Sequence, residues 1–144
     1  MRGQCFTIGG VRFFTMGGAY STDRLLRLEH VSWWREELPS RAEYETAVQT
    51  LRAQDFSADF ILTHTLPASA VPLLGLRPEP QEAALSGFLE RVYRRASFRM
   101  WFAGHFHVNR RLRPDLAVLS DGVAVIRERL PSAPRIYLHE SHSK

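Results

Sequence analysis

The sequence predicts an α/β domain in which strands and helices alternate along the chain. Two short apolar runs, residues 59–63 and 98–103, have the composition of buried strands. Residues 40–54 and 81–96 have the apolar spacing of helices, and an amino-terminal hairpin precedes them. The order of strand, helix, strand, helix and strand is that of a layered α/β fold.

The amino-terminal part is predicted to be a β-hairpin followed by a long loop. Residues 5–8 and 11–16 are β-type runs, and Gly9 and Gly10 between them suit a two-residue turn. Residues 19–39 form a connection that is long for a compact domain, which is typical of functional segments. We interpret four residues as candidate substrate contacts. Three of them, Tyr20, Arg24 and Trp34, lie in this loop, and the fourth, Arg110, lies further along the chain.

The first helix is predicted from a capping box, in which Ser40 and Glu43 each bond the other's backbone N–H. Near the carboxyl terminus, residues 116–119 and 123–127 are predicted to be two short strands that pair with each other through a turn. The 144 residues suit a single domain over the whole chain, with residues 139–144 as a loose polar tail.

Histidines follow both predicted buried strands. His64 comes directly after the first, and His105 and His107 follow the second, after Gly104. Functional groups in α/β folds collect beyond the carboxyl ends of strands, and residues at i and i+2 of an extended segment share a side. Three imidazoles can hold zinc and leave one position for water, and Gly104 would let the backbone bend close to the ion. The sequence therefore predicts a metal site here; strand-end histidines bonded only to backbone are the alternative.

The charge balance favours anionic partners. The formal net charge is +4, and eighteen of the nineteen positive residues are arginine, whose forked guanidinium matches phosphate oxygens. A general bias toward arginine is the alternative explanation. A stripe of four arginines on the second helix and just after it is a weaker signal for nucleic acid, because no aromatic residues alternate with it: Arg91, Arg94, Arg95 and Arg99.

The cellular location is predicted from what the sequence lacks. No apolar run approaches the roughly 20 residues of a membrane span, and the first residues do not have the pattern of a signal peptide. Cys5 is the single cysteine, which excludes an internal disulfide and suits a reducing compartment. We therefore expect a cytoplasmic protein without a membrane partner.

The histidine motifs resemble a known family. Residues 104–107, Gly-His-Phe-His, resemble the terminal Gly-His-x-His signature of calcineurin-like metallophosphoesterases. Residues 60–67, Phe-Ile-Leu-Thr-His-Thr-Leu-Pro, resemble the strand-plus-histidine motif that precedes it in that family. The stretch FFTMGGAYSTDR and the pair Trp33 and Trp34 are similar to a segment in a bacterial branch of the family. The resemblance covers roughly residues 4–127.

This resemblance implies a partial αββα sandwich, with mixed β-sheets flanked by helices, and a metal-dependent phosphoester hydrolase. His64 and His105 would bind one divalent ion and His107 the other, with ions of the manganese, iron or zinc class. The two ions would hold a bridging hydroxide that attacks the phosphorus of a phosphate ester.

Three motifs that the family carries in its first half are absent. No Asp-x-His and no Gly-Asp dipeptide occurs, and Asn109, the only asparagine, is not followed by histidine. The bridging aspartate and the general-acid histidine are therefore missing, and we assign no catalytic residue within this chain. We expect the carboxyl-terminal part of a longer enzyme, weak or inactive alone. The alternative is a non-catalytic remnant, or a module that binds anions or nucleic acid and retains the histidines.

The missing segment would normally supply central strands of a sheet. Without them we expect four apolar residues to lack packing partners, and the chain to associate with itself through an exposed sheet edge. These residues are Ile61, Leu62, Trp101 and Phe102.

Overall fold

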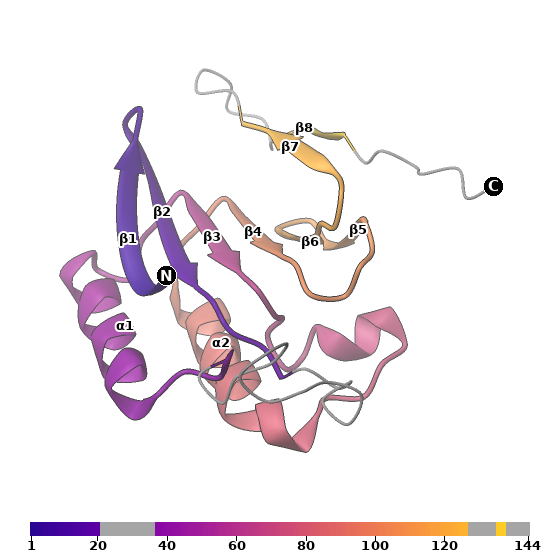
Figure 1. The fold of residues 1–144 in the computed structure, drawn as a ribbon. Coiled ribbons are helices and arrows are strands. Elements are labelled where there is room, and N and C mark those ends of the chain that lie inside the picture. The colour runs from indigo at the N-terminus through magenta and orange to yellow at the C-terminus, as the bar shows by residue number, and fades with distance from the viewer. Residues whose placement is uncertain (21–36, 127–134, 138–144) are drawn as a thin grey trace.

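A six-stranded mixed sheet is the framework of the fold in the computed structural model, which describes residues 1–20, 37–126 and 135–137 (Figure 1). Four neighbouring strands, β2, β3, β4 and β6, run parallel, and the outer strands β1 and β5 run antiparallel to their neighbours. The carboxyl ends of the four parallel strands therefore lie at one edge. The order across the sheet is β1 (Arg2–Ile8), β2 (Val11–Met16), β3 (Phe60–Thr63), β4 (Met100–Ala103), β6 (Leu116–Val118) and β5 (Arg110–Arg113).

The predicted amino-terminal hairpin is confirmed. Ile8 pairs with Val11, so Gly9 and Gly10 form the two-residue turn between β1 and β2. Their φ angles are 57° and 83°, and a turn with two positive φ angles matches the right-handed twist of the strands. Glycine adopts this conformation without strain, which explains why the pair defines the turn.

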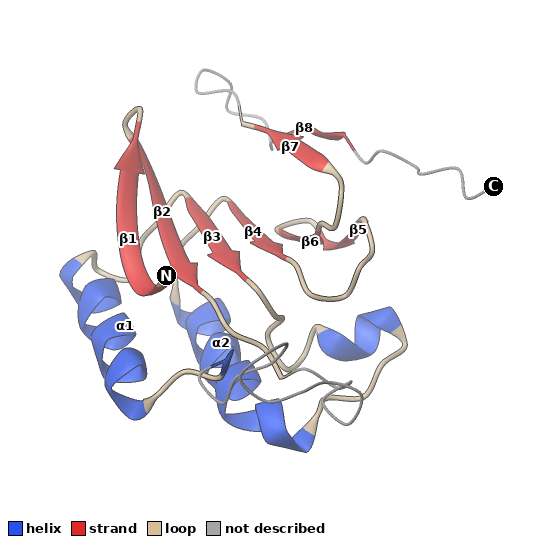
Figure 2. Cartoon of the chain, viewed as in Figure 1, coloured by secondary structure: helices blue, strands red, loops and turns tan. Residues whose placement is uncertain are grey.

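Both predicted helices are present and lie on one face of the sheet (Figure 2). The helix α1 (Arg41–Ala53) begins with the predicted capping box: the hydroxyl of Ser40 accepts from the N–H of Glu43, whose carboxylate accepts from the N–H of Ser40. The helix α2 (Ala83–Arg95) begins two residues later than predicted, because a 3₁₀ turn, η4 (Pro80–Glu82), precedes it. Another 3₁₀ turn, η3 (Val71–Leu74), lies in the connection after β3. None of the helices described is both long and apolar enough to cross a membrane.

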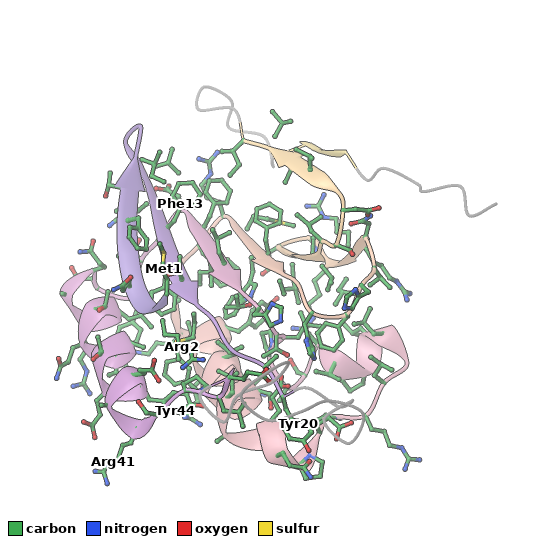
Figure 3. The ribbon with its side chains drawn as sticks, viewed as in Figure 1. Met1, Arg2, Phe13, Tyr20, Arg41 and Tyr44 are labelled. Atoms are coloured by element: carbon green, nitrogen blue, oxygen red, sulfur yellow. The ribbon has the colours of Figure 1, made fainter. Side chains whose placement is uncertain are left out.

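The two faces of the sheet are covered to different extents. The larger core lies between the sheet and the helices, and includes Trp101 and Leu89, neither of them exposed. A smaller cluster on the other face is built around Phe60 and Phe102 and includes Phe13, which Figure 3 labels. A two-stranded ribbon, β7 (Val123–Val125) and β8 (Arg135–Tyr137), lies on that side of the sheet (Figure 1). The helix face is therefore the more deeply packed one.

The predicted pairing of residues 116–119 with residues 123–127 is wrong. Strand β6 lies between β4 and β5, whereas β7 pairs with β8. All three residues of β6 are buried, so the strand suits an inner position with a neighbour on each side. The amide oxygen of Asn109 accepts from the N–H groups of Ser120 and Gly122, which shapes the turn where the chain leaves this sheet.

The expected lack of packing partners is wrong for three of the four residues named. Ile61 and Trp101 are not exposed and Phe102 is 7% exposed, because β2, β3 and β4 form an unbroken parallel ladder. Only Leu62, at 36% exposed, keeps part of its surface open. Both outer strands contain a register shift, and β5 carries three arginines, features that hinder edge-to-edge pairing. Self-association through these edges remains a prediction.

Candidate functional site

The register of β3 and β4 brings the histidine segments together. Thr63 pairs with Ala103, so the next residues, His64 and Gly104, lie side by side at the carboxyl edge. The N–H of His64 donates to the carbonyl of Met16 at 3.3 Å, and the carbonyl of His64 accepts from the N–H of Gly104 at 3.1 Å. The backbone of His64 is therefore held between the ends of β2 and β4.

The three histidines share one hollow, as the sequence predicts for strand-end residues. The ring centroids of His64 and His105 are 5.1 Å apart, with the ring planes inclined by 64°. His64 and His107 are exposed and His105 is partly buried. The hollow has a volume of about 320 Å³ and is lined by His64, Gly104, His105, His107, Leu119 and Ser120.

The route by which His105 and His107 reach this hollow differs from the predicted one. Strand β4 ends at Ala103, and the backbone then turns, with φ of 70° at His105 and 52° at His107. The N–H of Phe106 donates to the carbonyl of Gly104 at 2.9 Å, so His105 is the centre of a γ-turn. The extended segment that we inferred is therefore wrong, and the positive φ angles lie at the histidines rather than at Gly104. Such backbone costs about 1–3 kcal/mol per residue and is found most often at functional sites.

Gly104 has a different role from the predicted sharp bend. A β-carbon added to Gly104 would lie 3.6 Å from Nδ1 of His64 and 3.9 Å from the carbonyl oxygen of Leu119. These are ordinary contact distances, so the backbone itself tolerates a side chain here. What the glycine does is leave space beside Nδ1 of His64.

Burial lowers the pKa of His105 below its usual value. The charge of Glu82 acts in the opposite direction, His64 and His107 lower this pKa further, and Glu37 raises it slightly. A lowered pKa keeps the imidazole neutral at pH 7, and the neutral form is the one with a nitrogen lone pair for a cation.

Glu82 is a residue of this region that the sequence reading missed. It is only 6% exposed, lies just before α2, and its carboxylate accepts from the backbone N–H of Tyr20 at 2.9 Å. Buried carboxylates are uncommon without a partner or a function. The available signal was an acidic residue in the first turn of a helix, but nothing local in the sequence places it near His105.

The donor set suits one borderline ion better than two hard ones. Imidazole nitrogen is a ligand for zinc, whereas manganese prefers carboxylate oxygen. Across residues 1–20, 37–126 and 135–137, no three histidine, cysteine, aspartate or glutamate side chains are already arranged to hold a metal ion. The three histidines thus supply suitable donors without a preformed coordination sphere.

No protein-family model, no curated protein and no solved structure matches this chain. Functional conclusions therefore depend on the residues of the site and on the motif resemblance.

Of the four predicted substrate contacts, the structure describes Tyr20 and Arg110. Tyr20, which Figure 3 labels, is partly buried where the chain continues beyond β2, and its backbone N–H donates to the carboxylate of Glu82 at the end of η4. Arg110 is the first residue of β5; it is exposed and does not line the hollow. Arg24 and Trp34 lie outside the described residues, as do Trp33 and residues 139–144. Of the four candidates, the two that the structure describes, Tyr20 and Arg110, are therefore not in the lining of the hollow.

The arginine stripe has partners within the protein. Arg94 forms an ion pair with Glu90 at 2.7 Å. The guanidinium carbons of the other three lie over aromatic rings, at 5.9 Å for Arg91 over Phe88, 3.8 Å for Arg95 over Phe56 and 5.5 Å for Arg99 over Phe60. Each of the four arginines thus has a partner within the protein, and binding of nucleic acid by the stripe remains a prediction.

Proposed function

We propose that this chain is part of a metal-dependent phosphoester hydrolase of the calcineurin-like type. The observation that carries the proposal is the meeting of His64, His105 and His107 at one hollow beyond the ends of two adjacent parallel strands. The resemblance of residues 60–67 and 104–107 to two successive motifs of that family gives the reaction class.

In this proposal the three imidazoles hold divalent cations. His64 and His105, whose rings are in contact, would hold one ion, and His107, two residues after His105 in the chain, would hold a second. Bound divalent ions supply positive charge that polarises phosphoryl oxygens and lowers the pKa of water. His105 contributes a neutral imidazole at pH 7, because burial opposes its protonation. The hollow gives a phosphate ester access to all three rings.

The αββα architecture is part of the same proposal. Helices cover one face of the sheet, and among the described residues the ribbon of β7 and β8 lies on the opposite face (Figure 1). That face carries the apolar cluster around Phe60 and Phe102. Phe13 is partly buried there and Leu62 is 36% exposed. An apolar face of this kind supports the packing of a second sheet against it.

The second candidate is a histidine-bearing module without turnover. It is favoured by the lack, in the part of the chain that the structure describes, of three ligands arranged for a metal ion. It is also favoured by the absence of the aspartate motifs and of the general-acid motif from the sequence.

Zinc titration of the purified chain by calorimetry tests the metal site. We expect weak binding of a single zinc ion, and loss of that binding in His64→Ala and His105→Ala. Gln49→Ala, at an exposed position of α1, is the control and should bind as the original chain does. Absence of histidine-dependent binding would remove the metal proposal.

Hydrolysis of an aryl phosphate with added Mn²⁺ tests the reaction. We expect little turnover from the chain alone, because the three histidines offer imidazole nitrogen, whereas a hard ion such as Mn²⁺ prefers carboxylate oxygen. A chain extended by a segment that carries the absent aspartate and general-acid motifs should show turnover that His107→Ala then abolishes. An inactive extended protein would favour the module without turnover, and strong activity of the chain alone would show that the missing carboxylates are not essential.

A further inference from the structure

We infer that Thr63 and Trp101 are positioning residues that fix the imidazole of His64 in the hollow. The inference rests on the proposed metal site and adds two residues that do not line the hollow. Trp101 lies on β4 and Thr63 is the last residue of β3, so the pair joins the two strands that carry the histidines.

Two successive hydrogen bonds, here called the relay, connect Trp101 through Thr63 to the backbone of Thr65. The indole Nε1–H of Trp101 donates to the hydroxyl oxygen of Thr63 at 2.8 Å. That hydroxyl in turn donates to the carbonyl oxygen of Thr65 at 2.6 Å. His64 is the residue between the two threonines, so the relay closes a short ring around it.

The relay completes the restraint of the His64 backbone. The N–H and the carbonyl of His64 are already bonded to Met16 and Gly104. The bond from Thr63 fixes the next peptide unit, which prevents the chain from changing direction after β3. Trp101 is not exposed at all and packs against the rings of Tyr93 and Phe98, so the donor that anchors the relay is itself held rigidly. Ligands held by a second set of fixed groups keep their orientation toward an ion.

Thr65 provides a matched comparison within the same turn. Its side chain is completely buried, whereas that of Thr63 is partly buried, and its hydroxyl has no hydrogen-bond partner among the residues described. Replacing either threonine by valine changes the side-chain shape to the same extent. Only the change at Thr63 breaks the relay, because the relay reaches Thr65 through its backbone carbonyl.

The test compares Thr63→Val, Thr63→Ser and Thr65→Val by zinc titration at a temperature where each is fully folded. We expect Thr63→Val to weaken zinc binding by about 10- to 100-fold, the range seen when groups that orient metal ligands are removed. Thr63→Ser keeps the hydroxyl and should bind within about threefold of the original chain. Thr65→Val should bind zinc as the original chain does. Equal affinities for all three would overturn the inference, as would an equal loss in both valine variants.

A second measurement separates this inference from the proposed function. In the metal-free protein, the imidazole C–H signals of His64 in an NMR spectrum should shift or split in Thr63→Val and stay unchanged in Thr65→Val. If the original chain binds no zinc, the proposed metal site fails while this comparison still decides the positioning role. An unchanged His64 signal in Thr63→Val would then refute it.

Discussion

A β-carbon on Gly104 would lie 3.6 Å from Nδ1 of His64, so the glycine leaves room beside a nitrogen that can bind a cation. For Gly104→Ala we expect a stability change within about 0.5 kcal/mol, because the added carbon makes only ordinary contacts. Zinc affinity should fall by about tenfold, since the methyl group would compete for the space beside Nδ1. Thermal unfolding and zinc titration of the same sample measure both. Unchanged zinc affinity would show that the ion does not use this side of His64.

The capping box of α1 should contribute to stability in a pH-dependent way. Hydrogen bonding to the backbone N–H of Ser40 lowers the pKa of Glu43 from 4.5; burial opposes this shift, and the Ser40 hydroxyl and Arg2 lower the pKa further. A carboxyl whose pKa is lowered by folding stabilises the protein above its unfolded pKa, and that contribution is lost as pH falls below about 4.5.

Two substitutions test the capping box. Ser40→Ala should reduce the free energy of unfolding at pH 7 by about 1 kcal/mol, because an N–H of the first turn loses its acceptor. In Glu43→Gln the free energy of unfolding should decline less between pH 5 and pH 3 than in the original chain. The difference between the two declines should be on the order of the contribution of one carboxyl group. Denaturant unfolding across this pH range measures both. Identical pH profiles for the original chain and Glu43→Gln would contradict the assignment.

Gly3 is the position where the contact of β1 with α1 leaves least room. Its φ is 68°, and an added β-carbon would lie 2.7 Å from both Cα and Cβ of Ala47. Gly3→Ala should therefore lower the free energy of unfolding by about 2–4 kcal/mol, through backbone strain and overpacking. Gly87→Ala, within α2, should instead raise it by about 0.5–1 kcal/mol, because among the described residues the nearest atom to an added β-carbon is in the Arg91 guanidinium, at 3.8 Å. Equal effects at the two positions would rule out the steric explanation.

Local signals in the sequence were sufficient for the features that depend on neighbouring residues. The turn at Gly9 and Gly10 and the capping box at Ser40 each involve residues close together in the chain, and both are confirmed. The position of His64 at the same edge as His105 was predictable for a related reason, because parallel strands joined by a helix end at the same edge.

Features that depend on distant contacts were not predictable from the sequence. Strand β5, with its three arginines, lacks the alternation of a typical strand and exists because β6 provides a partner for it. The turn around His105 was read as extended because its γ-turn is not indicated by any glycine at that position. The proximity of Glu82 to the histidines arises from the packing of α2, which no local pattern encodes.

The left-handed backbone at His105 and His107 limits how this loop can evolve. A residue with a β-carbon is less stable than glycine in that conformation by about 1–2 kcal/mol, so glycine at either position would strengthen the fold. A lineage selected for stability alone would drift toward glycine on both sides of Phe106. Under the proposed function, histidine at these positions gives up stability in return for metal binding, and a descendant that no longer needed the imidazoles would be expected to lose them there first.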